Sequence, residues 1–303
     1  MDEMRFDGRV AIVTGAGGGL GREYALLLAS RGAKVVVNDL GTSRYGEGSD
    51  AGLAGKVVDE IRAAGGEAVA NGSSVASREG CAAIARTALD NYGSIDILIH
   101  NATINRPGPF RDMTYEDFSE VLDVHVGGAF HLAKEAFPRM CDAGYGRIVL
   151  VSSIAGLYGD RNIAAYSTGK GAVIGLANAL ALEGADHGVT ANCIVPAAQT
   201  RLAEGRDTDG FPPWGPDLVA PAAGWLAHES CPANGQLFVA LAGRMAHAYV
   251  AETRGVYQPE WTIEDVAGRA GEIADRSDQQ VFSPVPRGFY DHLEYSFGMA
   301  KGG

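Results

Sequence analysis

Short apolar runs alternate with segments of helical periodicity along most of this 303-residue chain. The runs read VAIVTG, KVVVND, EAVANG, IDILIHNA, RIVLVSS and VTANCIVP, with GQLFVALAG as a candidate seventh. Several are continuously apolar instead of alternating, which is typical of strands buried on both faces. Strands and helices in this order form a parallel sheet with helices on both sides. We therefore predict a doubly wound, three-layer α/β fold with seven parallel strands.

A glycine-rich turn follows the first predicted strand. Thr14 to Gly21 read TGAGGGLG, and such glycines let the backbone approach a pyrophosphate at the helix N-terminus. The run is informative because it lies inside a strand–helix–strand unit. Asp39 ends the second strand about twenty residues further on, where a carboxylate can bind ribose hydroxyls and repel a 2′-phosphate. The pattern predicts a Rossmann-type NAD site, and a simple turn cap is the alternative for Asp39.

Tyr166 and Lys170 lie four residues apart in a predicted helix, so their side chains share one face. An ammonium group beside a phenol favours the phenolate and lowers the tyrosine pKa from about 10. Such a phenol can exchange a proton with an alcohol or ketone near neutral pH. Ser153 ends the fifth strand and can hydrogen-bond the same substrate oxygen. We predict these three residues as catalytic, although a Tyr/Lys pair taken alone is usually a surface pair.

The composition argues against several partners. A formal net charge of −12 and a pI near 5.0 disfavour nucleic acid and anionic membranes. The four cysteines are widely spaced without a CxxC pair, so we predict no metal site, no disulfide framework and a reducing compartment. No apolar stretch reaches the roughly 18 residues of a membrane span, and the N-terminus lacks an apolar signal core. We expect a soluble, cytoplasmic protein.

These motifs together resemble the short-chain dehydrogenase/reductase family. The resemblance rests on TGAGGGLG, NAT after the fourth strand, Ser153 and YSTGK, and it extends from about Arg9 to Val239. Further segments resemble the (3R)-hydroxyacyl-CoA dehydrogenase module of multifunctional β-oxidation enzymes, which also oxidises 17β-hydroxysteroids. These segments are VVNDLG, YGRIVLVSS, GLANALALEG and WLAHESCPANGQLF. The resemblance implies an NAD-dependent enzyme of lipid metabolism that acts on CH–OH groups.

The resemblance also implies a role for each matching residue. Tyr166 is the general acid/base, Lys170 lowers its pKa and binds the nicotinamide ribose, and Ser153 orients the substrate oxygen. Asp39 holds the adenosine ribose. The residues implied in cofactor binding are Gly15, Gly18, Gly19, Leu20, Gly21, Asp39, Leu40, Ser74, Val75, Asn101, Ala102, Thr103, Tyr166, Lys170, Pro196, Ala198 and Thr200.

Four positions depart from the family pattern. Thr103 replaces the glycine of Asn-Ala-Gly, Ala197 replaces a glycine after Pro196, and Ser74 replaces an adenine-contacting aspartate. His125, in DVHVGG, stands where the wider family has an asparagine that helps to position a water near the lysine. The hydroxyacyl-CoA subgroup often has histidine there. We therefore predict His125 as a fourth catalytic residue in a proton relay, with a buried core histidine as the alternative.

The substrate is less constrained. Residues 201–216, RLAEGRDTDGFPPWGP, suit a mobile cover over an acyl chain or a steroid, or an ordinary surface loop. Loop arginines could bind CoA phosphates or be solvated charges, and these are Arg106, Arg111, Arg201 and Arg206. Three functions stay open: an NAD-dependent 3-hydroxyacyl-CoA dehydrogenase, a dehydrogenase of 17β-type hydroxysteroids or steroid side-chain CoA esters, and a catalytically silent NAD-binding interaction protein.

The chain divides into two predicted parts. Residues 1–255 form the dinucleotide-binding and catalytic domain, and residues 256–303 form a C-terminal extension. The extension contains Trp261 and the aromatic residues of GFYDHLEYSFG. Exposed aromatic residues at this density are costly, so we expect the extension to pack on its own domain or on a partner subunit. In the family, the helices carrying His125 and Tyr166 form a dimer interface, which implies a homodimer or homotetramer.

Overall fold

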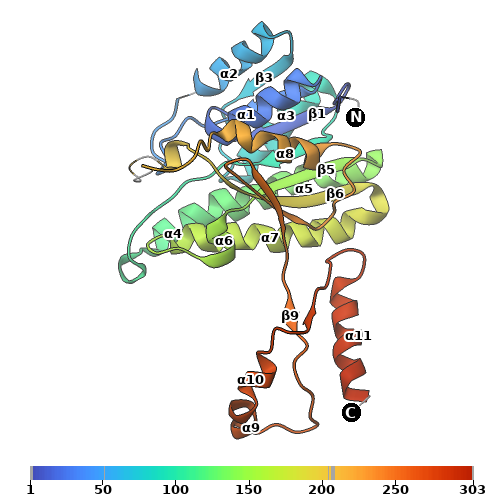
Figure 1. Ribbon diagram of the computed structural model, residues 1–303. Helices are drawn as coiled ribbons and strands as arrows, with labels where there is room; N and C mark the ends of the chain where they lie inside the picture. Colours follow the sequence, from blue (N-terminus) through green and yellow to red (C-terminus); the bar gives the residue numbers. More distant parts are fainter. Residues whose placement is uncertain (1–2, 51, 204, 206–208, 302–303) are drawn as a thin grey trace.

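The computed structural model describes residues 3–50, 52–203, 205 and 209–301. An eight-stranded sheet forms its centre, in the order β3-β2-β1-β4-β5-β6-β7-β8 (Figure 1). The strands are β1 (Val10–Thr14), β2 (Lys34–Asn38), β3 (Glu67–Asn71), β4 (Ile97–His100), β5 (Gly146–Val151), β6 (Val189–Ala197), β7 (Leu237–Leu241) and β8 (Arg244–Ala248). The strand order reverses direction between β1 and β4, which is the place where open α/β sheets bind ligands.

The sheet has one strand more than the seven predicted. Strands β1 to β7 are parallel, and β8 pairs with β7 in the antiparallel direction. Ala242 and Gly243 join them with φ values of 48° and 78°, and two positive φ values are what a tight hairpin turn requires. The predicted doubly wound, mostly parallel α/β architecture is confirmed, with an antiparallel edge strand added.

Helices cover both faces of the sheet. One face carries α1 (Gly19–Ser30), α2 (Gly52–Ala63) and α8 (Ala220–Ala227), and the other carries α3 (Arg78–Tyr92), α5 (Gly128–Ala143) and α7 (Ala164–Gly184). Alternate strand residues supply the two cores: Ala11 and Val13 belong to the first, Val10 and Ile12 to the second. The continuously apolar runs therefore reflect burial on both sides.

The single helix predicted from about Thr114 to Asp142 is interrupted. It consists of α4 (Tyr115–Leu122), one π-helical turn η2 (Asp123–Gly127), and α5. Thr114 Oγ1 accepts a hydrogen bond from Asp117 N (3.0 Å), as expected for an N-cap. A π turn inserts one extra residue into a helix and is frequent at functional sites. Here it contains His125.

Short helical elements connect the remaining parts. They are α6 (Ile154–Tyr158) and the 3₁₀ turns η1 (Phe110–Asp112), η3 (Ala185–His187), η4 (Arg201–Ala203) and η5 (Pro216–Leu218).

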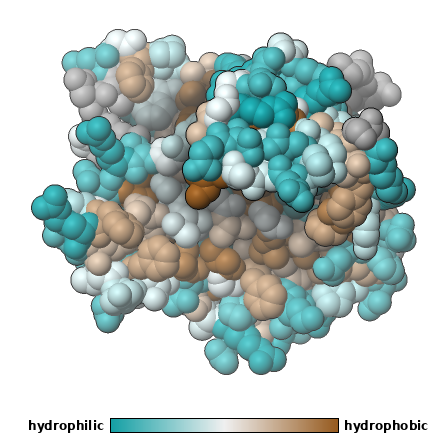
Figure 2. Space-filling view, turned by 90° about the horizontal axis from the view of Figure 1, so that it is seen from below, coloured by the Kyte–Doolittle hydropathy of each residue, from teal (hydrophilic) through white to brown (hydrophobic). Residues whose placement is uncertain are grey.

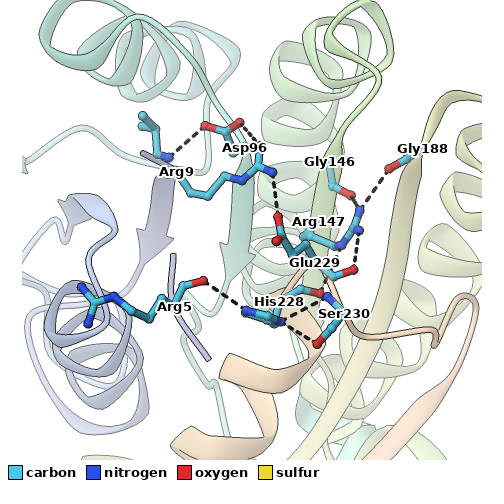
Figure 3. Close-up of polar contacts among 10 residues, drawn as sticks. Arg5, Arg9, Asp96, Gly146, Arg147, Gly188, His228, Glu229 and Ser230 are labelled. Atoms are coloured by element: carbon cyan, nitrogen blue, oxygen red, sulfur yellow. Dashed lines mark hydrogen bonds and ion pairs between the residues drawn. The ribbon is translucent and has the colours of Figure 1, made fainter. Parts of the chain in front are cut away.

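A polar cluster joins several elements at the amino end of the sheet (Figure 3). The Arg147 guanidinium, almost fully buried, donates to the carbonyl oxygens of Gly146 (2.8 Å), Gly188 (3.0 Å) and Glu229 (3.3 Å). Arg9 forms an ion pair with the Glu229 carboxylate (2.9 Å). These contacts hold β5, the start of β6 and the residues after α8 together at the end opposite the ligand-binding edge.

The C-terminal segment stands apart from the sheet (Figure 1). Its elements are β9 (Glu252–Thr253), α9 (Ile263–Gly268), α10 (Ala270–Ile273), β10 (Gln279–Gln280) and α11 (Gly288–Lys301), and β9 pairs with β10. Val285 packs against the second core, and Gln236 Nε2 donates to Ser283 Oγ (3.2 Å). Figure 2 shows apolar groups gathered on the face of the molecule seen from this end. Among the described residues, no helix is long and apolar enough to cross a membrane.

Candidate active site

A cavity of about 630 Å³ lies at the carboxyl ends of the parallel strands. Every residue predicted to be catalytic or to bind the cofactor lines this cavity, except Gly21 and His125. The lining residues come from the ends of six strands, β1 to β6, although they are dispersed over most of the sequence. The fold therefore brings the predicted residues to one place.

The glycines of the first turn are needed for its shape. Gly15 has a φ of +62°, and a Cβ on it would come within 2.8 Å of Ala102 Cα. A Cβ on Gly21 would lie 2.2 Å from the Gly15 carbonyl oxygen, so Gly21 serves the packing of the turn and not the cavity wall. Asn101 Nδ2 donates to the carbonyl oxygens of Thr14 and Gly15 (both 3.0 Å). The turn leaves room in front of the α1 N-terminus, which fits the pyrophosphate of a dinucleotide.

Asp39 lies at the end of β2 and is 7% exposed. Its Oδ2 accepts from Gly17 N and its Oδ1 accepts from Gly41 N, both at 2.7 Å. A carboxylate has about four acceptor positions, so two stay available for ribose hydroxyls. The negative charge at this place fits a cofactor without a 2′-phosphate.

Ser153, Tyr166 and Lys170 line the cavity from β5 and α7. Ser153 precedes α6, and its Oγ accepts from Ala155 N (3.2 Å), which leaves its hydrogen free to donate. Lys170 Nζ lies 5.7 Å from the centre of the Tyr166 ring, as the four-residue spacing on one helix predicts. The arrangement can supply one hydrogen-bond donor and one proton-exchanging phenol to a substrate oxygen.

Lys170 is 3% exposed, which is rare for a lysine. The Lys170 Nζ donates to the Val151 carbonyl oxygen (2.8 Å). The Ser152 Oγ donates to the backbone carbonyl oxygen of Lys170 (2.6 Å). Burial lowers the pKa of Lys170 to about 7. A lysine in this environment can change its charge near neutral pH, unlike a surface lysine.

His125 is 1% exposed and lies behind the cavity wall. Its Nε2 contacts Thr103 Oγ1 (2.7 Å) and the Ile104 carbonyl oxygen (3.1 Å). Its ring lies edge-on to the Tyr166 ring, with centres 5.3 Å apart and planes at 83°. Burial and the nearby Lys170 hold the pKa of His125 well below its usual range, so the imidazole is neutral. His125 is thus a buried neighbour of Tyr166.

His100 is a buried polar residue behind the cavity that the sequence did not single out. Its Nδ1 contacts Thr14 Oγ1 (3.2 Å) and its Nε2 contacts the Val124 carbonyl oxygen in the π turn (3.2 Å). Thr14 Oγ1 in turn accepts from the backbone N–H groups of Asn101 and Ala102 (both 3.0 Å). Burial lowers the pKa of His100 to about 3. The available signal was a histidine at the end of the apolar strand IDILIHNA.

The predicted loop arginines differ in their surroundings. Arg106 forms ion pairs with Glu120 (2.7 Å), Asp117 (3.4 Å) and Glu47 (3.7 Å), so its charge is already neutralised. Arg201 lines the cavity and donates to the Thr42 carbonyl oxygen (3.1 Å). Arg111 is exposed and does not line the cavity, and Arg206 lies outside the described residues.

The predicted cover segment contributes to the cavity wall. Leu202 and Trp214 line the cavity together with Ile163 from the loop before α7. Phe211 is exposed and contacts the Trp214 ring with centres 5.8 Å apart. Leu202, Trp214 and Ile163 give this side of the wall an apolar part beside Arg201, which suits a substrate with an apolar portion.

Comparison with known proteins identifies the family. Residues 9–208 match the family model described as short chain dehydrogenase. The chain belongs to the short-chain dehydrogenase family. Members of this family are oxidoreductases that act on CH–OH groups with a nicotinamide cofactor, so the predicted enzyme class is confirmed.

Three relatives illustrate the extent of the likeness. A short-chain type dehydrogenase/reductase of Mycobacterium tuberculosis is 42% identical over 279 residues, which cover 90% of this chain and 96% of the relative. Peroxisomal multifunctional enzyme type 2 of Drosophila melanogaster is 42% identical over 307 residues, which cover 99% of this chain and 51% of that enzyme. The solved structure of a 7α-hydroxysteroid dehydrogenase with NADH and 7-oxo glycochenodeoxycholic acid superposes with a TM-score of 0.71 at 31% identity, covering 79% of this chain and 95% of that one. This short-chain dehydrogenase thus spans about half the length of the Drosophila relative.

Proposed function

We propose that this protein is an NAD-dependent oxidoreductase that interconverts a secondary alcohol and a ketone on an apolar substrate, with a 3-hydroxyacyl-CoA as its preferred substrate. The observation that carries the proposal is the meeting of Ser153, Tyr166 and Lys170 in the cavity that also contains the glycine turn after β1. Alcohol oxidation needs a proton acceptor beside the place where a dinucleotide binds, and this cavity offers both.

The side chains divide the work as follows. Ser153 donates a hydrogen bond to the substrate oxygen and orients it. In the oxidation direction Tyr166 takes the proton of the substrate hydroxyl, and in the reduction direction it returns a proton to the carbonyl oxygen. A protonated Lys170 favours the phenolate of Tyr166. The bound nicotinamide supplies the acceptor or donor of the hydride.

The proposed cofactor is NAD and not NADP. The residues that would hold it are the cofactor-binding residues predicted from the sequence, with Asp39 at the adenosine ribose. The support is the buried carboxylate of Asp39, which offers acceptors to two ribose hydroxyls and repels a 2′-phosphate. We expect kcat/KM with NAD to exceed that with NADP by at least about 100-fold. An equal or higher value with NADP would contradict the assignment.

Two substrate classes have specific support. The 3-hydroxyacyl-CoA is favoured by the segments that resemble hydroxyacyl-CoA dehydrogenase modules, and by Arg201 at the cavity wall as a cation for a CoA phosphate. Arg106 offers less, because three carboxylates already surround it. The hydroxysteroid alternative, which includes steroid side-chain CoA esters, is favoured by the apolar side chains Ile163, Leu202 and Trp214 and by the structural likeness to a hydroxysteroid dehydrogenase.

A direct comparison of rates decides between these substrates. The enzyme is supplied with NAD and with a (3R)-3-hydroxyacyl-CoA, a 17β-hydroxysteroid or a steroid side-chain CoA ester at equal concentrations. We expect the highest kcat/KM with the 3-hydroxyacyl-CoA. A higher value with the free steroid would favour the second candidate instead.

A catalytically silent NAD-binding protein is the alternative of another class. NAD reduction by a secondary alcohol that saturates with substrate and is lost in Tyr166→Phe would exclude it. NAD binding without turnover on all three substrates would support it.

We also propose a homodimer or homotetramer in which the extension, residues 256–303, packs on a partner subunit. The support is the exposure of Phe289, Tyr290 and Phe297 on α11, and of Phe130 on α5. Light scattering of the purified protein tests this proposal, and a monomer at micromolar concentration would contradict it.

We propose the cytoplasm as the compartment because all four cysteines are free thiols.

A further inference from the structure

Two residues from separate elements, Thr103 and Gly169, enclose the imidazole ring of His125. Thr103 follows β4, His125 lies in the π turn η2, and Gly169 lies inside α7. On one side, His125 Nε2 contacts Thr103 Oγ1 (2.7 Å) and the Ile104 carbonyl oxygen (3.1 Å). On the other side the ring packs against Gly169, where a Cβ would come within 2.6 Å of His125 Nδ1. The ring is therefore held from two sides.

The contacts determine which ring nitrogen carries the hydrogen. The Ile104 carbonyl oxygen can only accept, so it requires a hydrogen on Nε2. His125 Nδ1 is buried and has no hydrogen-bond partner among the described residues. If Nδ1 carried the hydrogen, a donor would be buried without a partner. This costs more free energy than the other tautomer, in which Nδ1 is a buried acceptor without a partner. The neutral tautomer with hydrogen on Nε2 follows, and Thr103 Oγ1 shares that hydrogen with the Ile104 oxygen.

The glycine at position 169 is explained by the same ring. Glycine inside a helix is destabilising relative to alanine, and Gly169 is buried near the start of a 21-residue helix. An alanine Cβ at this position would also come within 3.0 Å of His125 Cβ and 3.1 Å of His125 Cγ. The imidazole therefore needs the space that glycine leaves, at a cost to the helix.

The ring enclosed in this way touches the predicted general acid/base. His125 and Tyr166 meet edge-on with ring centres 5.3 Å apart, a preferred arrangement of two aromatic rings. We propose that Thr103 and Gly169 are positioning residues, which hold the His125 ring against Tyr166 and thereby fix the direction of the Tyr166 phenol in the cavity. This inference rests on the proposed function of Tyr166 as the proton-exchanging group.

Variants of Thr103 test the hydroxyl contact. Thr103→Val keeps the size of the side chain and removes the hydroxyl, and we expect kcat to fall about 10-fold. Because the phenol then leaves its place near Lys170, the acidic limb of the pH–rate profile moves to higher pH. Thr103→Ser restores the hydroxyl and should recover most of the rate. A normal kcat in Thr103→Val would overturn the proposal.

Double variants show whether both residues act through His125. Gly169→Ala should also lower kcat about 10-fold in the wild-type background. In a His125→Ala background the ring is absent, so adding Thr103→Val or Gly169→Ala should change kcat by less than about two-fold. Effects that instead multiply in the double variants would mean that Thr103 and Gly169 act without His125, and the proposal would be wrong.

A measurement independent of turnover examines the ring itself. Histidine ¹⁵N signals, assigned to His125 by their loss in His125→Ala, should report a neutral ring with hydrogen on Nε2 from about pH 6 to pH 8. Both Thr103→Val and Gly169→Ala should shift these signals. A hydrogen on Nδ1, or signals that neither variant shifts, would contradict the proposal that Thr103 and Gly169 hold the His125 ring.

The two proposals can fail separately. Full activity in Tyr166→Phe would remove the proposed function, while the ¹⁵N signals would still test how the ring is held. Loss of activity in Tyr166→Phe combined with multiplying effects in the double variants would overturn only the positioning role.

Discussion

The two ends of the parallel sheet are built for different purposes. At the amino end, the buried Arg147 donates to backbone carbonyl oxygens at four positions, and Arg9 pairs with Glu229 (Figure 3). At the carboxyl end, Lys170 and His125 are buried and have lowered pKa values; Lys170 lines a cavity of about 630 Å³, and His125 lies behind its wall. The same sheet therefore carries a network of hydrogen bonds and ion pairs at its amino end. At its carboxyl end it carries buried titratable side chains with shifted pKa values.

The difference shows where stability and chemistry are located. A buried cation that donates to four carbonyl oxygens from several elements holds its surroundings in place. A buried lysine with a pKa of about 7 has too little compensation to keep its charge firmly, which weakens the fold but allows proton exchange near neutral pH. We expect substitutions at the amino end to affect the free energy of unfolding, and substitutions at the carboxyl end to affect turnover.

The largest expected effect is that of Tyr166→Phe on turnover. Removal of the phenolic hydroxyl deletes the proton-exchanging group, so kcat should fall by about 10²- to 10⁴-fold. The melting temperature should change little, because the ring and its contact with His125 remain. Initial-rate kinetics and calorimetry measure these quantities. Tyr115→Phe, at an exposed tyrosine of α4, is the matched control and should behave as wild type.

The second effect concerns the opposite end. Arg147→Met keeps much of the length of the side chain but removes the hydrogen bonds that Arg147 donates to four backbone carbonyl oxygens, and we expect a loss of about 2–4 kcal/mol in the free energy of unfolding. The kcat of the folded enzyme should stay the same. Urea unfolding and initial rates measure both, with Arg5→Met at an exposed arginine as control. A large fall in kcat without a loss of stability would break the division between the two ends.

The third effect depends on pH. The pKa of Lys170 is about 7 in the folded chain and near its ordinary value of 10.5 when unfolded, so between these values the unfolded state binds more protons. Its contribution to the free energy of unfolding therefore rises as pH increases from 7, by up to about 1.4 kcal/mol per pH unit, and is constant below 7. Urea unfolding at pH 7 and pH 9 should show wild type gaining stability relative to Lys170→Met. Parallel changes in the two proteins would contradict the lowered pKa.

The smallest effect concerns the choice of dinucleotide. Asp39→Asn removes the charge that opposes a 2′-phosphate, and we expect the ratio of kcat/KM for NAD to that for NADP to fall about 10-fold. Asp59→Asn, at an exposed aspartate of α2, should leave the ratio unchanged. Competition between the two dinucleotides measures this ratio. No change in Asp39→Asn would show that other residues select the cofactor.

Much of the architecture follows from local patterns. Continuously apolar runs require strands buried on both faces, and the glycine turn between β1 and α1 requires a backbone that only glycine adopts without strain. The four-residue spacing of Tyr166 and Lys170 is enough to place both on one face of α7. The eighth strand was missed because β8 has a short, mixed sequence whose pairing depends on the hairpin at Ala242 and Gly243.

The sequence by itself determined the α/β fold, the glycine turn, and the set of side chains gathered at the carboxyl end of the sheet. Tertiary structure alone decided that Thr103 and Gly169 both contact the ring of His125. It also decided that carboxylates surround Arg106. It also decided that a π turn divides the helix predicted from 114 to 142. The physical reason is range: periodicity and turn chemistry act within a few residues, whereas these contacts depend on how distant elements pack against one another.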